Sequence, residues 1–147
     1  MDERNIEQQV WQRVRQAQDR IQENTLAQLQ RETMELAAAY RMLGEQFTGN
    51  PREQALRLYR GENANAAALA GLGILSRQEG ERLKHWQPGK ESARKVLERC
   101  YHRTRRCLTE YMARSADGEY GIVFQKLAER EGEHCAIIAE LLGTIER

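Results

Sequence analysis

The sequence predicts an all-α protein in which four helices form a bundle, preceded by an extra N-terminal helix. Ala, Leu, Glu, Gln and Arg are abundant, and these residues favour helix over strand. Hydrophobic residues make up 40% of the chain and charged residues 31%, which suits helices that each bury one stripe. A chain of 147 residues suits a single domain with one core.

Apolar residues at three- and four-residue steps, together with capping and turn signals, define the expected helices. These helices cover about 2–22, 25–47, 51–69, 91–114 and 120–145. Asn24-Thr25 with Gln28 is typical of a capping box that starts the second of them. The apolar pattern also allows the first two helices to continue unbroken. Gly71 and Gly73 weaken the helix before them, so we expect it to end near Leu69.

The lengths of the connections predict how the helices are arranged. Short turns join the first bundle helix to the second and the third to the fourth, so each pair should be an antiparallel hairpin. The link over 76–91 is long and polar, and we expect a crossover there with a short helix from Ser76 to Lys84. One long crossover is typical of a ferritin-like bundle, whereas an up-and-down bundle needs only short loops. We therefore expect an N-terminal helical extension at 1–24 and a ferritin-like four-helix bundle at 25–147.

Glu131 and His134, late in the chain, are the strongest candidates for metal ligands. Their i, i+3 spacing places them on one face of a helix, and apolar residues at the same steps indicate that this face points inward. A carboxylate and an imidazole that project inward together are a feature of di-metal sites in helical bundles. The same spacing also occurs by chance on surface helices. It recurs in two further pairs, Glu32 with Glu35 and Glu62 with Asn65.

The chain also repeats itself over about half its length. Tyr40 and Tyr111 have almost the same separation along the chain as Glu62 and Glu131. Each half therefore resembles one helical hairpin, and two hairpins make a bundle.

Three motifs in order resemble the rubrerythrin branch of the ferritin-like superfamily. They are Glu-x-x-Glu with Ala and Tyr in Glu32–Tyr40, then Glu62, then Phe124-Gln-Lys-Leu-Ala-Glu-Arg-Glu-Gly-Glu-His-Cys135. The resemblance covers about 25–145 and lacks the rubredoxin-like cysteine domain of full rubrerythrins. It implies a site for two irons, or iron and manganese, that reacts with peroxide or oxygen and takes electrons from an external donor protein. The metal ligands that it implies are Glu32, Glu35, Glu62, Glu131 and His134.

The chain departs from the family pattern at positions that matter for charge. Asn65 stands where the pattern has a histidine, and Arg103 and Arg106 stand where the third helix should offer a carboxylate. Two divalent ions need several anionic ligands, and an arginine cannot lose its proton to become one.

These departures leave two hypotheses. In the first, Arg103 and Arg106 point outward, His102 adds a ligand, and the chain is a rubrerythrin-like oxidoreductase that binds iron or manganese. In the second, the glutamates surround Arg106 in a metal-free ion network, and the degenerate bundle serves as a structural or partner-binding protein. Contact between either arginine and an inward glutamate would favour the second hypothesis.

Charge and cysteine content exclude several other classes. The net charge of +1 gives no broad basic field for nucleic acid. No apolar run reaches about 18 residues, so we expect neither a membrane span nor an export signal. Cys100, Cys107 and Cys135 form no Cys-x-x-Cys pair, which predicts reduced thiols in a cytoplasmic protein. The resemblance also implies a homodimer, because ferritin-like bundles of this size often pair.

Overall fold

The computed structural model describes residues 3–75, 91–116 and 118–145, and these residues are helical almost throughout. The elements in chain order are α1 (Glu3–Gln46), α2 (Gly49–Leu75), α3 (Ala93–Ser115), the 3₁₀ turn η1 (Gly118–Tyr120) and α4 (Gly121–Ile145). The predicted all-α class is therefore confirmed. The predicted crossover and its short helix from Ser76 to Lys84 lie outside the described residues.

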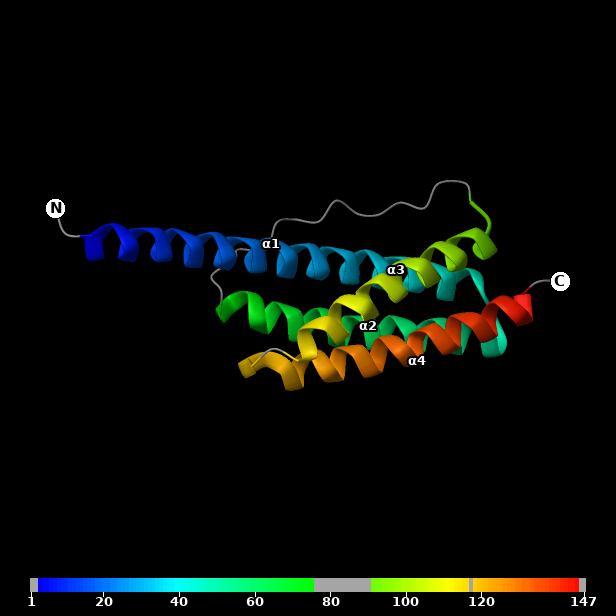
Figure 1. The fold of residues 1–147 in the computed structure, drawn as a ribbon. Helices are drawn as coiled ribbons and strands as arrows, with labels where there is room; N and C mark the ends of the chain where they lie inside the picture. The colour runs from blue at the N-terminus through cyan, green and yellow to red at the C-terminus, as the bar shows by residue number, and fades with distance from the viewer. Residues whose placement is uncertain (1–2, 76–90, 117, 146–147) are drawn as a thin grey trace.

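The four long helices lie side by side as two hairpins (Figure 1). α1 packs mainly against α2, and α3 packs mainly against α4, as the short connections predicted. α1 and α4 run in one direction, whereas α2 and α3 run in the other (Figure 1). Consecutive helices α2 and α3 are thus parallel, which is not the alternation of an up-and-down bundle.

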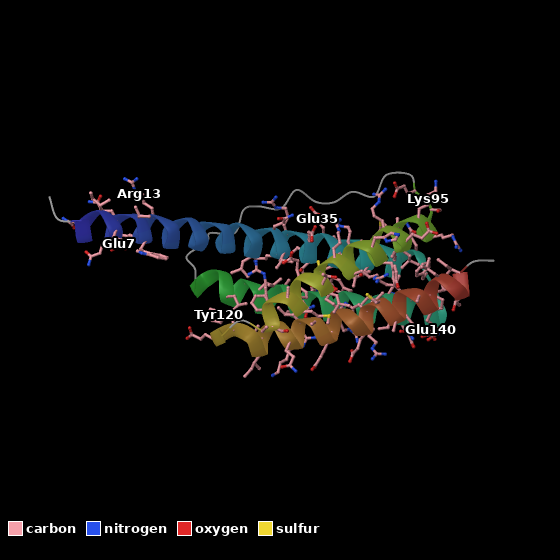
Figure 2. All side chains as sticks on the ribbon, viewed as in Figure 1. Glu7, Arg13, Glu35, Lys95, Tyr120 and Glu140 are labelled. Atoms are coloured by element: carbon pink, nitrogen blue, oxygen red, sulfur yellow. The ribbon has the colours of Figure 1, made fainter. Side chains whose placement is uncertain are left out.

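α1 is one unbroken helix of 44 residues, so the predicted break at Asn24-Thr25 is wrong and the continuous alternative holds. No glycine or proline interrupts α1 around these positions, and the residues that follow Thr25 are good helix formers. The N-terminal part of α1 projects past the ends of α2 and α3 (Figure 1), and Figure 2 shows Glu7 and Arg13 on this part. Trp11 on the same part is 59% exposed.

α2 continues to Leu75, beyond the end predicted near Leu69. Its backbone passes through Gly71 and Gly73, although each glycine in a helix costs about 1 kcal/mol relative to alanine. Leu69 and Leu72 are buried on the core side, and their burial offsets that cost.

The core is formed by apolar side chains from all four helices, with a few polar groups among them. Tyr40 and Tyr111 are fully buried, and each hydroxyl group is hydrogen-bonded to a threonine of the neighbouring helix. Cys100 and Cys107 are buried, and neither forms a disulfide among the described residues. None of the described helices combines the length and the apolarity that a bilayer crossing requires.

Candidate metal centre

Two core helices bring three of the predicted ligands together. Glu62 lies in the middle of α2, and Glu131 and His134 lie one turn apart on α4. One ligand atom of each residue lies within 4.8 Å of the other two, and all three side chains are buried. His134 Nδ1 is 2.8 Å from Glu62 Oε2 and 3.9 Å from Glu131 Oε1. This ring nitrogen therefore faces both carboxyl groups.

Asn65 and Arg130 extend the polar cluster. Asn65 lies one turn after Glu62 on α2, and its Nδ2 donates a hydrogen bond of 2.7 Å to Glu131 Oε1. Arg130 donates from Nη1 to Asn65 Oδ1 over 2.8 Å. Because the guanidinium group engages the amide oxygen, the amide nitrogen is held toward Glu131.

One oxygen of each buried carboxyl group lacks an ordinary hydrogen bond. Among the described residues, Glu62 Oε1 and Glu131 Oε2 have no partner of normal geometry. Buried polar atoms nearly always have partners, so an exception indicates a further ion or water. Carboxylate oxygens and an imidazole nitrogen are donors that divalent transition metals accept. The residues present therefore fit one cation at this point.

Burial controls the protonation of the cluster. It raises the pKa of Glu62 from 4.5 to about 7, although a hydrogen bond with Glu131 and the charge of Arg130 lower it. Burial, followed by the charge of Glu62 and the hydrogen bond with it, raises the pKa of Glu131 well above its ordinary value. Burial lowers the pKa of His134, so its imidazole is neutral at neutral pH. Because both pKa values are raised, protonation of the two carboxyl groups competes with metal binding.

His134 is fixed by contacts on three sides. Its Nδ1 is hydrogen-bonded to Glu62, and the Tyr40 ring meets it edge-on with ring centroids 6.3 Å apart. On the third side lies Gly61, where a Cβ atom would be only 2.2 Å from His134 Nε2. The ring fits only because position 61 has no side chain, so Gly61 is part of the site.

The other two predicted ligands, Glu32 and Glu35, lie outside this cluster. Glu35 forms an ion pair with Arg103, and Glu32 lies 3.6 Å from an Nη atom of Arg106. Glu32 also accepts a hydrogen bond of 3.4 Å from the Cys107 thiol. The structure therefore brings together three of the five predicted ligands and neutralises the other two with α3 arginines.

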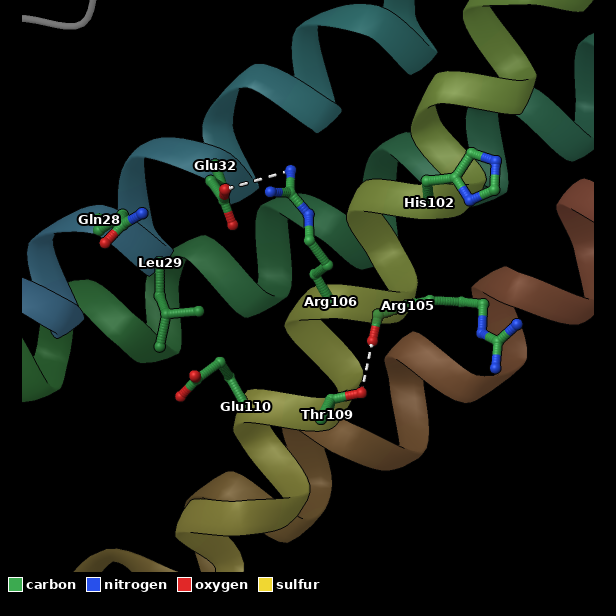
Figure 3. A pocket seen from close by; sticks show the side chains of 8 residues that line it. All are labelled: Gln28, Leu29, Glu32, His102, Arg105, Arg106, Thr109 and Glu110. Atoms are coloured by element: carbon green, nitrogen blue, oxygen red, sulfur yellow. Dashed lines mark hydrogen bonds and ion pairs between the residues drawn. The ribbon is translucent and has the colours of Figure 1, made fainter.

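Arg106 points outward, as the first hypothesis expects, whereas His102 does not take the ligand role that the same hypothesis gave it. Arg106 is 66% exposed and extends toward Glu32 along a surface groove of about 620 Å³ between α1 and α3 (Figure 3). It does not lie among buried glutamates. His102 is exposed on the rim of the same groove and points away from Glu32 (Figure 3), so it adds no ligand to the core. Other side chains of α3 take the core-facing positions, namely Thr104, Cys107 and Tyr111.

Comparisons of this chain with protein-family models, with curated proteins and with solved structures gave no match. The resemblance to rubrerythrins therefore depends on the residues quoted above. The function has to be inferred from the chemistry of the buried cluster, because a fold alone does not specify an activity.

Sequence reasoning missed two residues that shape the cluster, Gly61 and Arg130. Each directly precedes a candidate glutamate, so their separation along the chain equals that of Glu62 and Glu131. That repeat was the available signal, because it marked both as equivalent neighbours of a ligand.

Proposed function

We propose that this chain is a ferritin-like, rubrerythrin-type protein that binds one ion of iron or manganese and acts on peroxide or oxygen. The observation that carries the proposal is the convergence of Glu62, Glu131 and His134 in the core, with one unpartnered oxygen on each carboxyl group. Such an arrangement is costly to bury and gains its stabilisation when a cation is bound.

The direction of the helices supports the ferritin-like part of the proposal. Two antiparallel hairpins with parallel α2 and α3 (Figure 1) match a bundle with one long crossover. In such bundles the metal ligands project inward from facing helices, as Glu62 does from α2 and His134 from α4.

Charge favours one ion over two. The buried cluster offers two carboxylates, which neutralise one divalent cation in a medium of low dielectric constant. Glu32 and Glu35 already neutralise arginines, so they are not available for a second ion. When bound, iron or manganese would supply a change of redox state toward peroxide or oxygen, with electrons from an external donor protein.

The chain itself contributes restricted access and a fixed imidazole. Glu62, Glu131 and His134 are shielded from solvent, so only small molecules such as peroxide or oxygen suit this centre. The Tyr40 ring and the Gly61 backbone hold the imidazole of His134 in place. These features support a small, sheltered reaction volume in the middle of the bundle.

A metal-free, partner-binding bundle is the second candidate function. The ion pair between Arg103 and Glu35 favours it, because this contact belongs to the degenerate arrangement. Ile6, Val10 and Trp11 on the projecting part of α1 are exposed apolar side chains of the kind that partners cover.

Metal analysis distinguishes the two candidates. Protein purified without chelator, and protein reloaded with Mn²⁺ or Fe²⁺, should each contain close to one ion per chain. His134→Asn should abolish binding, whereas His102→Asn, on the exposed face of α3, should leave it unchanged. A ratio near zero after reloading would overturn the proposal in favour of the metal-free bundle.

A further inference from the structure

The two hairpins contact each other through reciprocal pairs, which reveals an approximate two-fold relation. Thr33 and Thr104 have the same separation along the chain as Tyr40 and Tyr111. Thr33 is hydrogen-bonded to Tyr111 over 3.1 Å, and Tyr40 is hydrogen-bonded to Thr104 over 3.0 Å. Each tyrosine thus meets the threonine of the other hairpin, as two-fold symmetry requires.

The ion pairs between α1 and α3 follow the same rule. Glu32 is equivalent to Arg103 and Glu35 to Arg106, because both pairs have the separation of the two tyrosines. The pairs formed are Glu35 with Arg103 and Glu32 with Arg106, again crosswise. Here the two hairpins have opposite charge at equivalent positions.

The buried cluster shows the same two-fold relation, although its equivalent residues are slightly closer along the chain than the two tyrosines are. Glu62 and Asn65 on α2 are equivalent to Glu131 and His134 on α4. Glu62 is hydrogen-bonded to His134, and Glu131 is hydrogen-bonded to Asn65. Each glutamate therefore contacts the residue that lies one turn after the other glutamate. Asn65 is therefore the two-fold equivalent of the histidine ligand.

The residues that precede the glutamates complete the relation and break its symmetry. Gly61 and Arg130 are equivalent by the same offset as Glu62 and Glu131. Gly61 lies against the ring of His134, leaving space for it, whereas Arg130 lies against Asn65 and donates to its amide oxygen. Glycine thus faces the bulky imidazole of His134, whereas the long side chain of Arg130 faces the shorter amide of Asn65.

We propose that Arg130 and Asn65 occupy the second half of a two-fold metal site and thereby limit the centre to one ion on the His134 side. The guanidinium group brings a permanent positive charge to the half that an ion would otherwise enter. Asn65 holds that charge in place through its oxygen and offers no imidazole. This inference rests on the proposed function, and it identifies the residues that set the number of ions.

The test is the double variant Asn65→His/Arg130→Gly, which copies the His134 and Gly61 half onto the other side. Mn²⁺ binding is measured by equilibrium dialysis on the full chain, for the variant and for the unaltered protein. The number of ions bound per variant chain should exceed that of the unaltered protein by one, and the second ion should bind more weakly than the first because the variant adds no carboxylate. The matched control is Arg60→Gly/Asn63→His, the same exchange at exposed positions of α2, which should add none.

A second variant guards against failure of the first to fold. Arg130→Met keeps an unbranched side chain but removes the charge, so Mn²⁺ should bind about tenfold more tightly or better because electrostatic repulsion is lost. Arg60→Met, at an exposed position, should not change the affinity.

The outcomes separate this inference from the proposed function. If the unaltered protein binds one ion and the double variant also binds one, Arg130 and Asn65 do not set the number, and the inference is overturned. If Arg130→Met binds Mn²⁺ equally well or more weakly, Arg130 is not an opposing cation, and the inference is likewise overturned. If the unaltered protein binds none while the double variant binds one, the proposed function fails, but Arg130 and Asn65 still block the second half of the site, as inferred.

Discussion

Gly61→Ala is the substitution whose effect follows most directly from the geometry of the site. The added Cβ atom would be 2.2 Å from Nε2 and 2.7 Å from Cε1 of His134, whereas ordinary contacts lie at 3.4–4 Å. The His134 ring would have to move by about 1 Å or more. It cannot do so freely, because it is only 3% exposed and its Nδ1 is bonded to Glu62.

The magnitude is a balance of three contributions. Overpacking a filled core costs about 1–3 kcal/mol. Weakening the hydrogen bond between His134 and Glu62 adds about 1 kcal/mol. Alanine in place of glycine within a helix returns up to about 1 kcal/mol. We therefore expect Gly61→Ala to lower the free energy of unfolding by about 2 kcal/mol, and the melting temperature by roughly 4–8 °C.

Thermal unfolding of metal-free protein, followed by circular dichroism, measures this change. Gly71→Ala is the matched control, because Gly71 lies on the same helix and a Cβ atom there would meet nothing within 4 Å. That control should stabilise the protein by up to about 1 kcal/mol. A His134→Asn background should remove most of the cost of Gly61→Ala. If Gly61→Ala stabilises the protein as the control does, the described contact between Gly61 and His134 is wrong.

Three further predictions concern charge and metal. Arg103→Leu removes a partly buried partner of Glu35 and should cost roughly 1–3 kcal/mol in urea unfolding. Arg106→Leu removes a guanidinium group that is 66% exposed and 3.6 Å from Glu32, so it should cost less than about 1 kcal/mol; equal effects would contradict the described positions. Because the folded state keeps a proton on Glu62 up to about pH 7 that the unfolded state releases near 4.5, metal-free stability should fall by roughly 3 kcal/mol as pH rises between these values. Glu62→Gln should flatten this decline in unfolding measured across the same range, and an unchanged slope would exclude Glu62 as its cause. Adding Mn²⁺ should raise the melting temperature more at pH 8 than at pH 6, since the ligands must lose protons; the same gain at both would show that no proton is displaced.

The sequence predicted the fold class and most of the helices, because apolar periodicity and turn residues are local signals. The predicted helix boundaries at Thr25 and near Leu69 were wrong, because such local signals compete there with burial and with the helix propensity of neighbouring residues. Whether a capping box interrupts a helix depends on what the chain packs against, and one sequence does not show that.

In the site, Glu131 and His134 were predicted from spacing and Glu62 from the resemblance to rubrerythrins, and the structure places the three together. Spacing could not show that Glu32 and Glu35 pair with arginines, because those contacts join α1 to α3 across about half of the chain. The role of Gly61 was equally hidden, since it consists of the space that glycine leaves for a ring on another helix.

An anomalous-scattering map from crystals grown with Mn²⁺ tests the central claim most directly. One peak should lie within bonding distance of His134 Nδ1 and of a carboxylate oxygen from each of Glu62 and Glu131. An absence of density at that point, or a peak only beside Glu32 and Glu35, would contradict the account.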